Sequence, residues 1–397
     1  MKNILVYHHS LRVGGITTVL YHYLNILAQL PDYKIDLVLI ETPYGNELDQ
    51  VPNNINKTCL LSKIEAEFDI LCYWKIKGNE SVDYFSSWQN EIKNQIKKRT
   101  LDYINSRPPY DLIINFGGDF DSFLNYYDLH SHTKIIRLIH ANQDIINFRN
   151  DFSYYRNIIN KHHKLISISD DMNKVLTQLV NGQADNEFNL TTDVQRIYNP
   201  VNLQAIRDKT QSDDPLLSEN YIVAVSGLYH GKGYPQMINM YHQLKQKGIS
   251  QKFYIVGDGY LREELTMQIK SLGLEQDCLL LGKKDNPFPY MKNAKLLIHA
   301  SESEGLPTVF IEAMTCGTPV VAFDCPTGPR DILADGQYGG LIPMGNNEQF
   351  VETVYELLTD ENKRQAYIEK LPEAVERFGL EKIGQEFKTL LDNLITQ

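Results

Sequence analysis

The sequence predicts an α/β protein of two domains, each a doubly wound parallel sheet covered by helices. Short, nearly all-apolar runs alternate with segments of helical periodicity, which is typical of strands buried on both faces of a parallel sheet. The alternation stops at the polar stretch 208–214 and restarts at residue 221, and 397 residues are too many for a typical single domain. We therefore expect a first domain at 1–205, a second at 206–375 and a separate C-terminal segment at 376–397.

Composition excludes several classes of protein. The net charge of −11 argues against a nucleic-acid partner, because such a protein needs a basic face to meet phosphates. No run of about 18 apolar residues appears, so no transmembrane helix is expected. The first residues are typical of a strand and not of a signal peptide. Five cysteines without CxxC spacing predict reduced thiols in a cytoplasmic protein: Cys59, Cys72, Cys278, Cys316 and Cys325.

The first half begins with a strand, a glycine-rich loop and a helix that extends to about residue 30. Gly14 and Gly15 form the loop, where backbone amides can approach a phosphate or sugar closely, although a simple tight turn is the alternative. The region 41–88 is rich in Asn and Tyr and is expected to be irregular. The other strands of this half are expected at 35–40, 111–115, 134–139, 165–168 and 194–198.

Charged residues of the first half allow more than one interpretation. Lys93 and Lys97 lie on a predicted helix at 91–104, which favours a solvated helix face, with anionic lipid headgroups as the alternative partner. Asp119 and Asp121 form an Asp-x-Asp pair that can hold a metal-bound nucleotide, but a hard cation needs more oxygen ligands, so we expect no metal. His140 follows a strand and is either a hydrogen-bond donor to a ligand or a satisfied structural histidine.

The second half is more regular. The predicted helices lie at 235–244, 260–272, 308–316 and from 347 onward. The predicted strands lie at 221–226, 252–256, 278–282, 295–299 and 319–323. Gly257 and Gly259 form a Gly-x-Gly, but Arg262 occupies the place of the third glycine of a dinucleotide fingerprint. A dehydrogenase or an epimerase is therefore disfavoured.

The stretch 301–314 joins a buried strand to a helix and carries two carboxylates. Glu304 lies on the loop at the carboxyl end of the strand, where doubly wound sheets bind ligands, and Glu312 lies in the early turns of the helix. This helix start, the Gly14-Gly15 loop and Lys232 all favour an anion, and two domains facing across a cleft would place them around one nucleotide diphosphate. Carboxylates accept hydrogen bonds from sugar hydroxyls; the alternative is a capping residue and a solvated helix position.

At these residues the chain resembles the retaining, GT-B-fold glycosyltransferases of family 4, also called glycosyltransferase group 1. The resemblance covers roughly residues 220–345 and is weaker but consistent in the first half. Its motifs are Val256-Gly257-Asp258-Gly259, Gly282, Asn286-Pro287, residues 301–307, the Glu304 and Glu312 pair, Gly317-Thr318-Pro319-Val320-Val321 and Cys325-Pro326-Thr327-Gly328-Pro329, with Gly14-Gly15, His140, Ser169 and Asn199-Pro200 in the first half.

The resemblance implies two Rossmann-like domains with a nucleotide sugar in the cleft between them and the acceptor mostly on the N-terminal domain. Glu312 would bind the ribose hydroxyls and Glu304 the donor-sugar hydroxyls. Lys232 would neutralise the leaving diphosphate, Gly15 would approach the phosphates and His140 would contact the donor sugar. The last helix would cross back to the first domain, and no metal or other cofactor would be needed. The backbone expected to hold phosphate belongs to Gly305, Leu306, Pro307, Thr308 and Val309.

One position departs from the family pattern. Family members usually carry an arginine shortly before the lysine, and Gly227 stands in its place. Losing one bidentate partner of the diphosphate would weaken stabilisation of the leaving group by about 2 to 4 kcal/mol. Arg12, Arg330 or His230 would have to substitute for it. The departure therefore opens the alternative of a non-catalytic partner subunit or chaperone that keeps the fold.

The main hypothesis is an active retaining transferase of a hexose or N-acetylhexosamine. Its donor would be a nucleotide sugar, and the Cys325 to Pro329 run favours a UDP-sugar because it resembles polysaccharide-assembly members of the family. Its acceptor would be a glycan, polysaccharide or lipid-linked saccharide in cell-surface biosynthesis. The expected location is the cytoplasm, with peripheral contact at the inner face of the plasma membrane as an open alternative.

Overall fold

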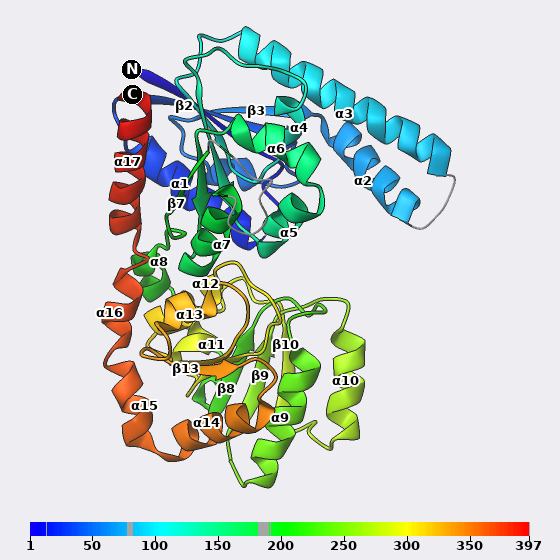
Figure 1. Cartoon of the computed structure of the whole chain (residues 1–397). Helices are drawn as coiled ribbons and strands as arrows, with labels where there is room; N and C mark the ends of the chain where they lie inside the picture. The colour runs from blue at the N-terminus through cyan, green and yellow to red at the C-terminus, as the bar shows by residue number, and fades with distance from the viewer. Residues whose placement is uncertain (13, 78–81, 182–189, 191, 397) are drawn as a thin grey trace. The chain divides into compact units, whose positions relative to one another are not determined.

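The structure is a computed structural model that describes residues 1–12, 14–77, 82–181, 190 and 192–396 (Figure 1). It divides into two compact units. Unit 1 comprises Met1–Ile168, Asn173–Ile197 and Gly384–Gln397, and unit 2 comprises Ser169–Met172 and Tyr198–Ile383. Residues 198–205 belong to unit 2, ahead of the expected start at 206, because Val201 donates a backbone hydrogen bond of 2.8 Å to the carbonyl of Phe378.

Unit 1 contains a seven-stranded sheet in the order β3-β2-β1-β4-β5-β6-β7, in which every pairing is parallel. The chain order reverses between β1 and β4, so the loops that leave these two strands lie side by side. The strands are β1 (Lys2–His8), β2 (Tyr33–Glu41), β3 (Asn56–Leu61), β4 (Leu112–Asn115), β5 (Lys134–Ile139), β6 (Lys164–Ser167) and β7 (Asp193–Arg196).

Helices cover both faces of this sheet. Leu5 and Tyr7 of β1 belong to the core on the side of α2 and α3, whereas Tyr23 of α1 packs on Phe387 of α17 with ring centroids 4.7 Å apart. The helices are α1 (Gly15–Ala28), α2 (Lys63–Lys77), α3 (Val82–Asn105), α4 (Asp121–Leu124), α5 (Asn142–Asn150), α6 (Phe152–Asn160), α7 (Asp170–Val180), α17 (Leu380–Thr396) and the 3-10 helix η1 (Glu47–Gln50).

The expectation of an irregular region at 41–88 is wrong. This region contains β3, all of α2 and the beginning of α3, and Figure 1 shows α2 and α3 as a helical hairpin that extends beyond the sheet. The strand escaped notice because β3 is an edge strand that begins with polar residues, Asn56, Lys57 and Thr58, and so lacks an apolar run. Arg99 of α3 fastens the hairpin to this strand, since it donates to Glu65 and to the carbonyl of Leu60 at 2.6 Å each.

Unit 2 contains a six-stranded parallel sheet in the order β10-β9-β8-β11-β12-β13, with its reversal between β8 and β11. Its strands are β8 (Tyr221–Val225), β9 (Lys252–Val256), β10 (Cys278–Gly282), β11 (Leu297–His299), β12 (Val320–Asp324) and β13 (Gly340–Pro343). Its helices are α8 (Leu203–Asp208), η2 (Pro215–Ser218), α9 (Tyr234–Gln246), α10 (Arg262–Ser271), α11 (Phe288–Lys292), α12 (Thr308–Thr315), α13 (Pro329–Leu333), α14 (Asn347–Thr359), α15 (Glu361–Ile368) and α16 (Leu371–Glu376).

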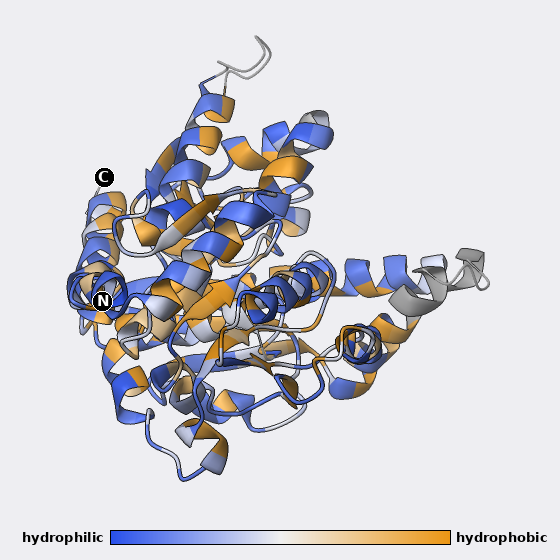
Figure 2. Cartoon of the chain, turned by 90° about the horizontal axis from the view of Figure 1, so that it is seen from below, coloured by the Kyte–Doolittle hydropathy of each residue, from blue (hydrophilic) through white to orange (hydrophobic). Residues whose placement is uncertain are grey.

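The main core of unit 2 joins one face of its sheet to α9, α10 and α14. Ile222, Phe253 and Val321 contribute from three strands and are all fully buried. In Figure 2 the strands are mostly orange, and many helices carry orange on one side and blue on the other. The predicted architecture of two α/β units with parallel sheets is therefore confirmed.

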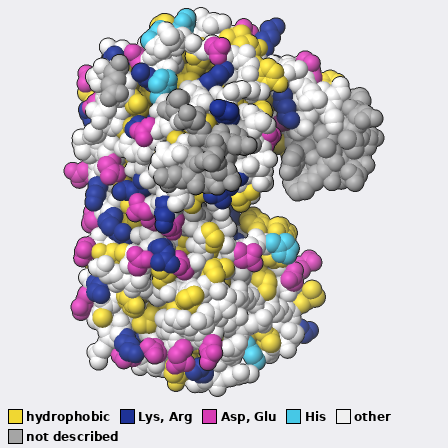
Figure 3. Space-filling view, viewed as in Figure 1, with side chains coloured by type: hydrophobic (Ala, Val, Ile, Leu, Met, Phe, Trp, Pro, Cys, Tyr) yellow, Lys and Arg dark blue, Asp and Glu magenta, His cyan; other side chains and the backbone are white. Residues whose placement is uncertain are grey.

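The surface seen in Figure 3 carries charges of both signs, and the described cysteines are free thiols. Acidic and basic side chains are interspersed over the described residues on the face seen in Figure 3. Within the described part of the chain, no helix is both long enough and apolar enough to cross a bilayer. Cys59, Cys278, Cys316 and Cys325 are free thiols, and the side chain of Cys72 lies outside the described residues.

Candidate active site

The topology of unit 2 brings Lys232 and Glu304 together. Because β8 and β11 are neighbours at the point where the strand order reverses, the loops after them share one edge of the sheet. Lys232 lies on the first loop and Glu304 on the second, and the lysine Nζ donates to Glu304 Oε1 at 2.7 Å. Gly233 makes this approach feasible: its φ is +71°, and a β-carbon there would lie 2.0 Å from the carbonyl oxygen of Ala300.

A third residue completes this cluster. His299, the last residue of β11, is buried, and its Nε2 lies 3.0 Å from the same Oε1 of Glu304. Among the described residues no hydrogen bond reaches the second oxygen, Oε2, so this oxygen remains an acceptor for a ligand hydroxyl. The sequence reasoning treated His299 only as the end of a strand; a histidine five residues before Glu304 was the signal available.

The cluster keeps Glu304 ionised. Burial acts to raise the pKa of Glu304, but the hydrogen bond with His299 and the positive charge of Lys232 outweigh it and lower the pKa to about 2. The side chain of Glu304 is only 13% exposed, so these interactions are poorly screened by solvent. A carboxylate of this kind is a permanent acceptor at neutral pH.

The Glu304 loop is held by hydrogen bonds from two directions. Ser301 donates its hydroxyl to the carbonyl of Gly231 at 3.0 Å, which ties the loop to the segment that carries Lys232. Thr327 donates its hydroxyl to the carbonyl of Glu304 and adopts a positive φ of 64°. A non-glycine residue in this conformation is strained, and such strain is concentrated at functional sites. This gives the Cys325 to Pro329 run a structural role.

Helix α12 follows directly after this loop. Its start is favourable for an anion, because its first amides point out of the helix and the proline side chain of Pro307 at the N-cap cannot accept a hydrogen bond from them. The residues predicted to hold phosphate form the end of the loop and the first turn of this helix: Gly305, Leu306, Pro307, Thr308 and Val309.

Glu312 lies one turn into α12, beyond Thr308. Burial raises the pKa of Glu312 to about 7, and a hydrogen bond from Thr308 opposes this effect. The described residues place no cation in an ion pair with Glu312, in contrast to Glu304. Glu312 is thus half ionised near neutral pH, and a ligand that donates hydroxyl groups would favour its ionised form.

Gly227 lies beneath an aromatic side chain. A β-carbon at Gly227 would lie 2.3 Å from Cε2 of Tyr229, so the tyrosine ring occupies the position of any side chain there. Each of the three candidates to replace the missing arginine already contacts another side chain. Arg12 pairs with Glu41 at 2.7 Å, Arg330 pairs with Asp324 and with Asp335, and the His230 ring packs on Tyr260.

The remaining predicted site residues lie in unit 1. His140 follows β5 and is buried against Phe116, with ring centroids 4.7 Å apart. Burial and the nearby His8 lower the pKa of His140 to about 3, so its imidazole is neutral. Neither ring nitrogen makes a hydrogen bond of standard geometry within the described residues. Gly14 precedes α1 and Gly15 begins it, and a β-carbon at Gly15 would meet no atom within 4 Å.

The Asp-x-Asp pair is divided between two partners. Asp119 lies 3.4 Å from His9 Nδ1, whereas Asp121 is buried and pairs with Arg137. His9 is the second residue that the sequence reasoning missed. The described residues contain no group of three or more His, Cys, Asp or Glu side chains with metal-binding geometry.

Comparisons with known proteins identify a family and individual proteins that this chain resembles. Residues 206–373 match the family described as glycosyl transferases group 1. The chain is 33% identical over 190 residues to the N-acetylgalactosamine-N,N'-diacetylbacillosaminyl-diphospho-undecaprenol 4-alpha-N-acetylgalactosaminyltransferase of Campylobacter jejuni, covering 48% of this chain and 51% of that protein. It is 26% identical over 220 residues to the poly(ribitol-phosphate) alpha-N-acetylglucosaminyltransferase of Staphylococcus aureus, covering 55% of this chain and 43% of that protein. The chain thus spans about half the length of the curated relatives it matches.

Solved structures show the same fold over the whole chain. A variant of S. aureus TarM, in complex with fondaparinux, alpha-GlcNAc-glycerol and UDP, aligns with a TM-score of 0.74 at 17% identity and covers 100% of both chains. Anabaena HepE in complex with UDP and glucose aligns with a TM-score of 0.71 at 20% identity, covering 99% of this chain and 100% of that one. The chain therefore has the GT-B fold of two Rossmann-like domains.

Proposed function

We propose that this chain is a retaining glycosyltransferase that moves a hexose or N-acetylhexosamine from a UDP-sugar to a glycan or lipid-linked acceptor in cell-surface polysaccharide synthesis. The observation that carries the proposal is the Lys232, Glu304 and His299 cluster at the strand-order reversal of unit 2. The relatives named above support it, since their names describe sugar transfer to diphospho-undecaprenol saccharides and to poly(ribitol phosphate).

Each element of unit 2 has a role in holding the donor. Glu304, ionised and with Oε2 unpaired among the described residues, accepts hydrogen bonds from donor-sugar hydroxyls. Glu312 accepts from the ribose diol. The first amides of α12 donate to phosphate oxygens, and Lys232 supplies a positive charge for the diphosphate. With a lysine and helix amides available for the phosphates, the proposed reaction requires no metal ion.

The proposed transfer proceeds on one face of the donor sugar. The bond between the anomeric carbon and the diphosphate oxygen breaks, and the acceptor hydroxyl forms its bond to that carbon from the same side. The hydroxyl proton passes to the departing phosphate oxygen. Negative charge grows on the diphosphate in this step, and Lys232 and the α12 amides stabilise it because they are fixed before reaction. His140, neutral and buried, remains the proposed hydrogen-bond donor of unit 1 to a donor-sugar oxygen.

The proposed setting is the cytoplasm, with the acceptor presented at the inner face of the plasma membrane. This setting follows from the class of acceptor, because a nucleotide-sugar donor is soluble and the lipid end of a lipid-linked saccharide is not. The chain would then meet the membrane only peripherally.

A second candidate function is a non-catalytic partner subunit that keeps the fold. The observation that favours it is the replacement of the family arginine by Gly227 beneath Tyr229, with Arg12 and Arg330 already paired to carboxylates. Such a protein would bind donor or glycan without turnover. Retention of Lys232 and Glu304 in contact favours the enzyme.

One experiment separates the two. Wild type and the Glu304→Gln variant are each incubated with UDP-glucose, UDP-galactose and their N-acetylated forms. The release of UDP by the two proteins is then compared. The enzyme predicts release that the variant lowers at least about 100-fold, the size typical for loss of a preorganised group. Glu302→Gln, at an exposed neighbour in the same loop, is the matched control and keeps full activity. Donor binding without release supports the partner subunit, and absence of both binding and release contradicts both.

A further inference from the structure

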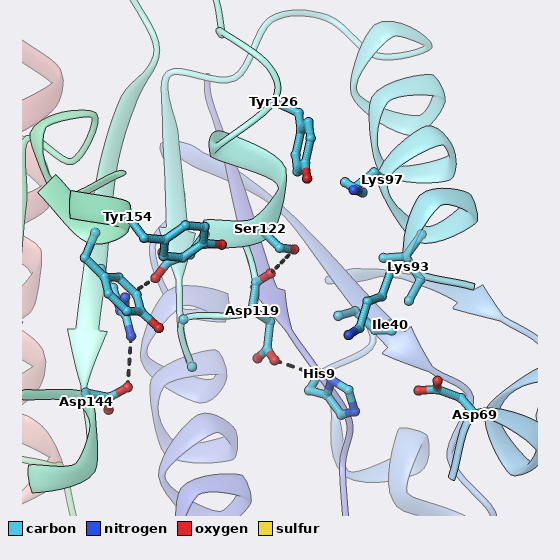
Figure 4. A pocket seen from close by; sticks show the side chains of 16 residues that line it. His9, Ile40, Asp69, Lys93, Lys97, Asp119, Ser122, Tyr126, Asp144 and Tyr154 are labelled. Atoms are coloured by element: carbon cyan, nitrogen blue, oxygen red, sulfur yellow. Dashed lines mark hydrogen bonds and ion pairs between the residues drawn. The ribbon is translucent and has the colours of Figure 1, made fainter. Parts of the chain in front are cut away.

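Unit 1 contains a cavity of about 550 Å³ beside helix α3 (Figure 4). Its floor is formed by residues that follow the central strands, among them His9 after β1 and Asp119 after β4. One wall is α3, from which Lys93 and Lys97 extend toward the floor. Tyr126 and Tyr154 line the same space. A cavity of this size, lined by aromatic rings and a few convergent polar groups, is typical of a binding site for a small ligand.

The floor near His9 is electrically balanced within the protein. His9 lies between two carboxylates, with Nδ1 3.4 Å from Asp119 Oδ1 and Nε2 3.2 Å from Glu41 Oε1. Burial acts to lower the pKa of His9, but hydrogen bonds to both carboxylates outweigh it and raise the pKa to about 10. The imidazolium therefore offsets Asp119, whose side chain is still 25% exposed and can accept hydrogen bonds.

The other side of the floor has one cation for two carboxylates. Arg137 is buried, pairs with Asp121 and donates to Asp144 Oδ1 at 2.9 Å. It also lies over the ring of Phe148, with its guanidinium carbon 4.7 Å from the ring centroid. Asp144 remains 24% exposed, so this side of the floor presents carboxylate oxygens to the cavity. Such oxygens suit the hydroxyl groups of a saccharide.

The two lysines of α3 differ from His9 and Arg137 in their partners. Lys93 and Lys97 are four residues apart and so share one face of the helix. Within the described residues neither forms an ion pair, and Lys97 Nζ lies 3.8 Å from the ring centroid of Tyr126. The expectation of a solvated helix face holds for Lys93, which is exposed, whereas Lys97 is half-buried against Tyr126. Asp69 also lines the cavity; burial raises the pKa of Asp69, and the charge of Lys93 acts to lower it.

We propose that Lys93 and Lys97 form an anion subsite that binds the phosphate of a phosphate-bearing saccharide, whose sugar ring lies on the Asp119 and Asp144 floor. This inference rests on the proposed function, since it names the class of acceptor. Two ammonium groups that form no ion pair within the described residues, at the wall of a cavity, favour an anionic ligand over a neutral one. The tyrosine rings offer apolar surface to a sugar ring, and the floor offers hydroxyl acceptors.

The test is a titration of the purified full chain with N-acetylglucosamine 1-phosphate and with N-acetylglucosamine. Wild type is expected to bind the phosphate ester more tightly, with an affinity that falls as salt is added. The double variant Lys93→Gln/Lys97→Gln should weaken the ester by about tenfold or more, since charge-assisted hydrogen bonds are lost, and should leave the unphosphorylated sugar unchanged.

Two controls make the result specific. Lys98→Gln lies next to the pair on α3 but is exposed and does not line the cavity, so it should bind the ester like wild type. Lys232→Gln reports on phosphate binding in unit 2. Equal affinity for ester and sugar, an unchanged double variant, or a loss that follows Lys232 instead would overturn the subsite. The titration uses no donor, so absence of glycosyl transfer would contradict the proposed reaction without removing an anion subsite that this titration detects.

Discussion

The ring of Tyr229 covers Gly227 so closely that a β-carbon on the glycine would lie 2.3 Å from Cε2 of the ring. Gly227 is the position at which the resembling family carries an arginine. Tyr229 is 48% exposed and is a flexible side chain, so nothing rigid prevents the ring from turning away. In the loop that carries Lys232, this chain therefore has an aromatic ring in the place where the resembling family has a cation.

Restoring the arginine should increase turnover. In Gly227→Arg/Tyr229→Ala the guanidinium gains room and can pair with the leaving diphosphate, which should raise UDP release by at least about tenfold. Gly227→Arg alone should gain less, because Tyr229 must first move. Steady-state kinetics with the best donor measures both, and Tyr229→Ala alone is the control for removal of the ring. A double variant no faster than Tyr229→Ala would show that the arginine is not what limits the reaction.

Much of this site could be anticipated from the sequence, because local patterns and strand order determine it. Apolar runs located β8 and β11, and the rule that ligands bind at strand carboxyl ends directed attention to Lys232 and Glu304, which the structure places 2.7 Å apart. Ser169, a motif residue of the first half, follows the predicted strand at 165–168, and its hydroxyl accepts a hydrogen bond from the Met172 amide at 3.2 Å.

The features that the sequence did not predict depend on contacts between segments that are distant along the chain. His9 follows β1 and Glu41 ends β2, and only the pairing of these two strands brings the two side chains within 3.2 Å. Lys93 and Lys97 carry no local sign of a cavity, because the floor that they face is built from β1, β4 and β5. The edge strand β3 lacks an apolar run, so its pairing with β2 was invisible as well.

The ion pairs of Glu304 should make the free energy of unfolding depend on pH in the acidic range. The folded-state pKa of about 2 lies below the ordinary value of 4.5, so the unfolded chain binds the proton more readily. This contribution is complete above about pH 4.5, amounts to about 3 kcal/mol at most, and is lost as the pH falls toward about 2. Denaturant unfolding of wild type and Glu304→Gln between pH 7 and pH 3 should show a difference that shrinks with acid. A difference independent of pH would contradict the assignment.

Glu312 should have the opposite pH dependence. Its folded-state pKa of about 7 exceeds the ordinary 4.5, so the folded state retains the proton. Stability is then greatest below about pH 4.5 and falls as the pH rises through about 7. Glu312→Gln should be more stable than wild type at pH 8, by at most about 3 kcal/mol, yet should bind UDP more weakly because the ribose hydroxyls lose an ionised acceptor.

Two measurements check the Glu312 prediction. Thermal unfolding at pH 5 and pH 8 gives the stability, and calorimetric titration with UDP gives the affinity. Glu264→Gln, at an exposed carboxylate on α10, should change neither quantity. Tighter UDP binding by Glu312→Gln at pH 8 would rule out a ribose-binding role for Glu312.

Gly328 should be required for the shape of the Glu304 loop. Its φ is +92°, and a β-carbon there would lie 2.7 Å from the carbonyl oxygen of Gly305 and from Cδ of Pro307, which are backbone and ring atoms that cannot easily yield. Gly328→Ala should therefore lower stability by more than the roughly 1 to 2 kcal/mol that an ordinary left-handed residue costs, and should weaken UDP-sugar binding as the loop shifts. Gly345→Ala separates the two effects, since its φ is +76° but no atom lies within 4 Å of the added carbon. Denaturant unfolding and donor titration of both variants should show a stability loss in each but weaker binding only in Gly328→Ala, and equal behaviour of the two would mean that contact with the Glu304 loop is unimportant.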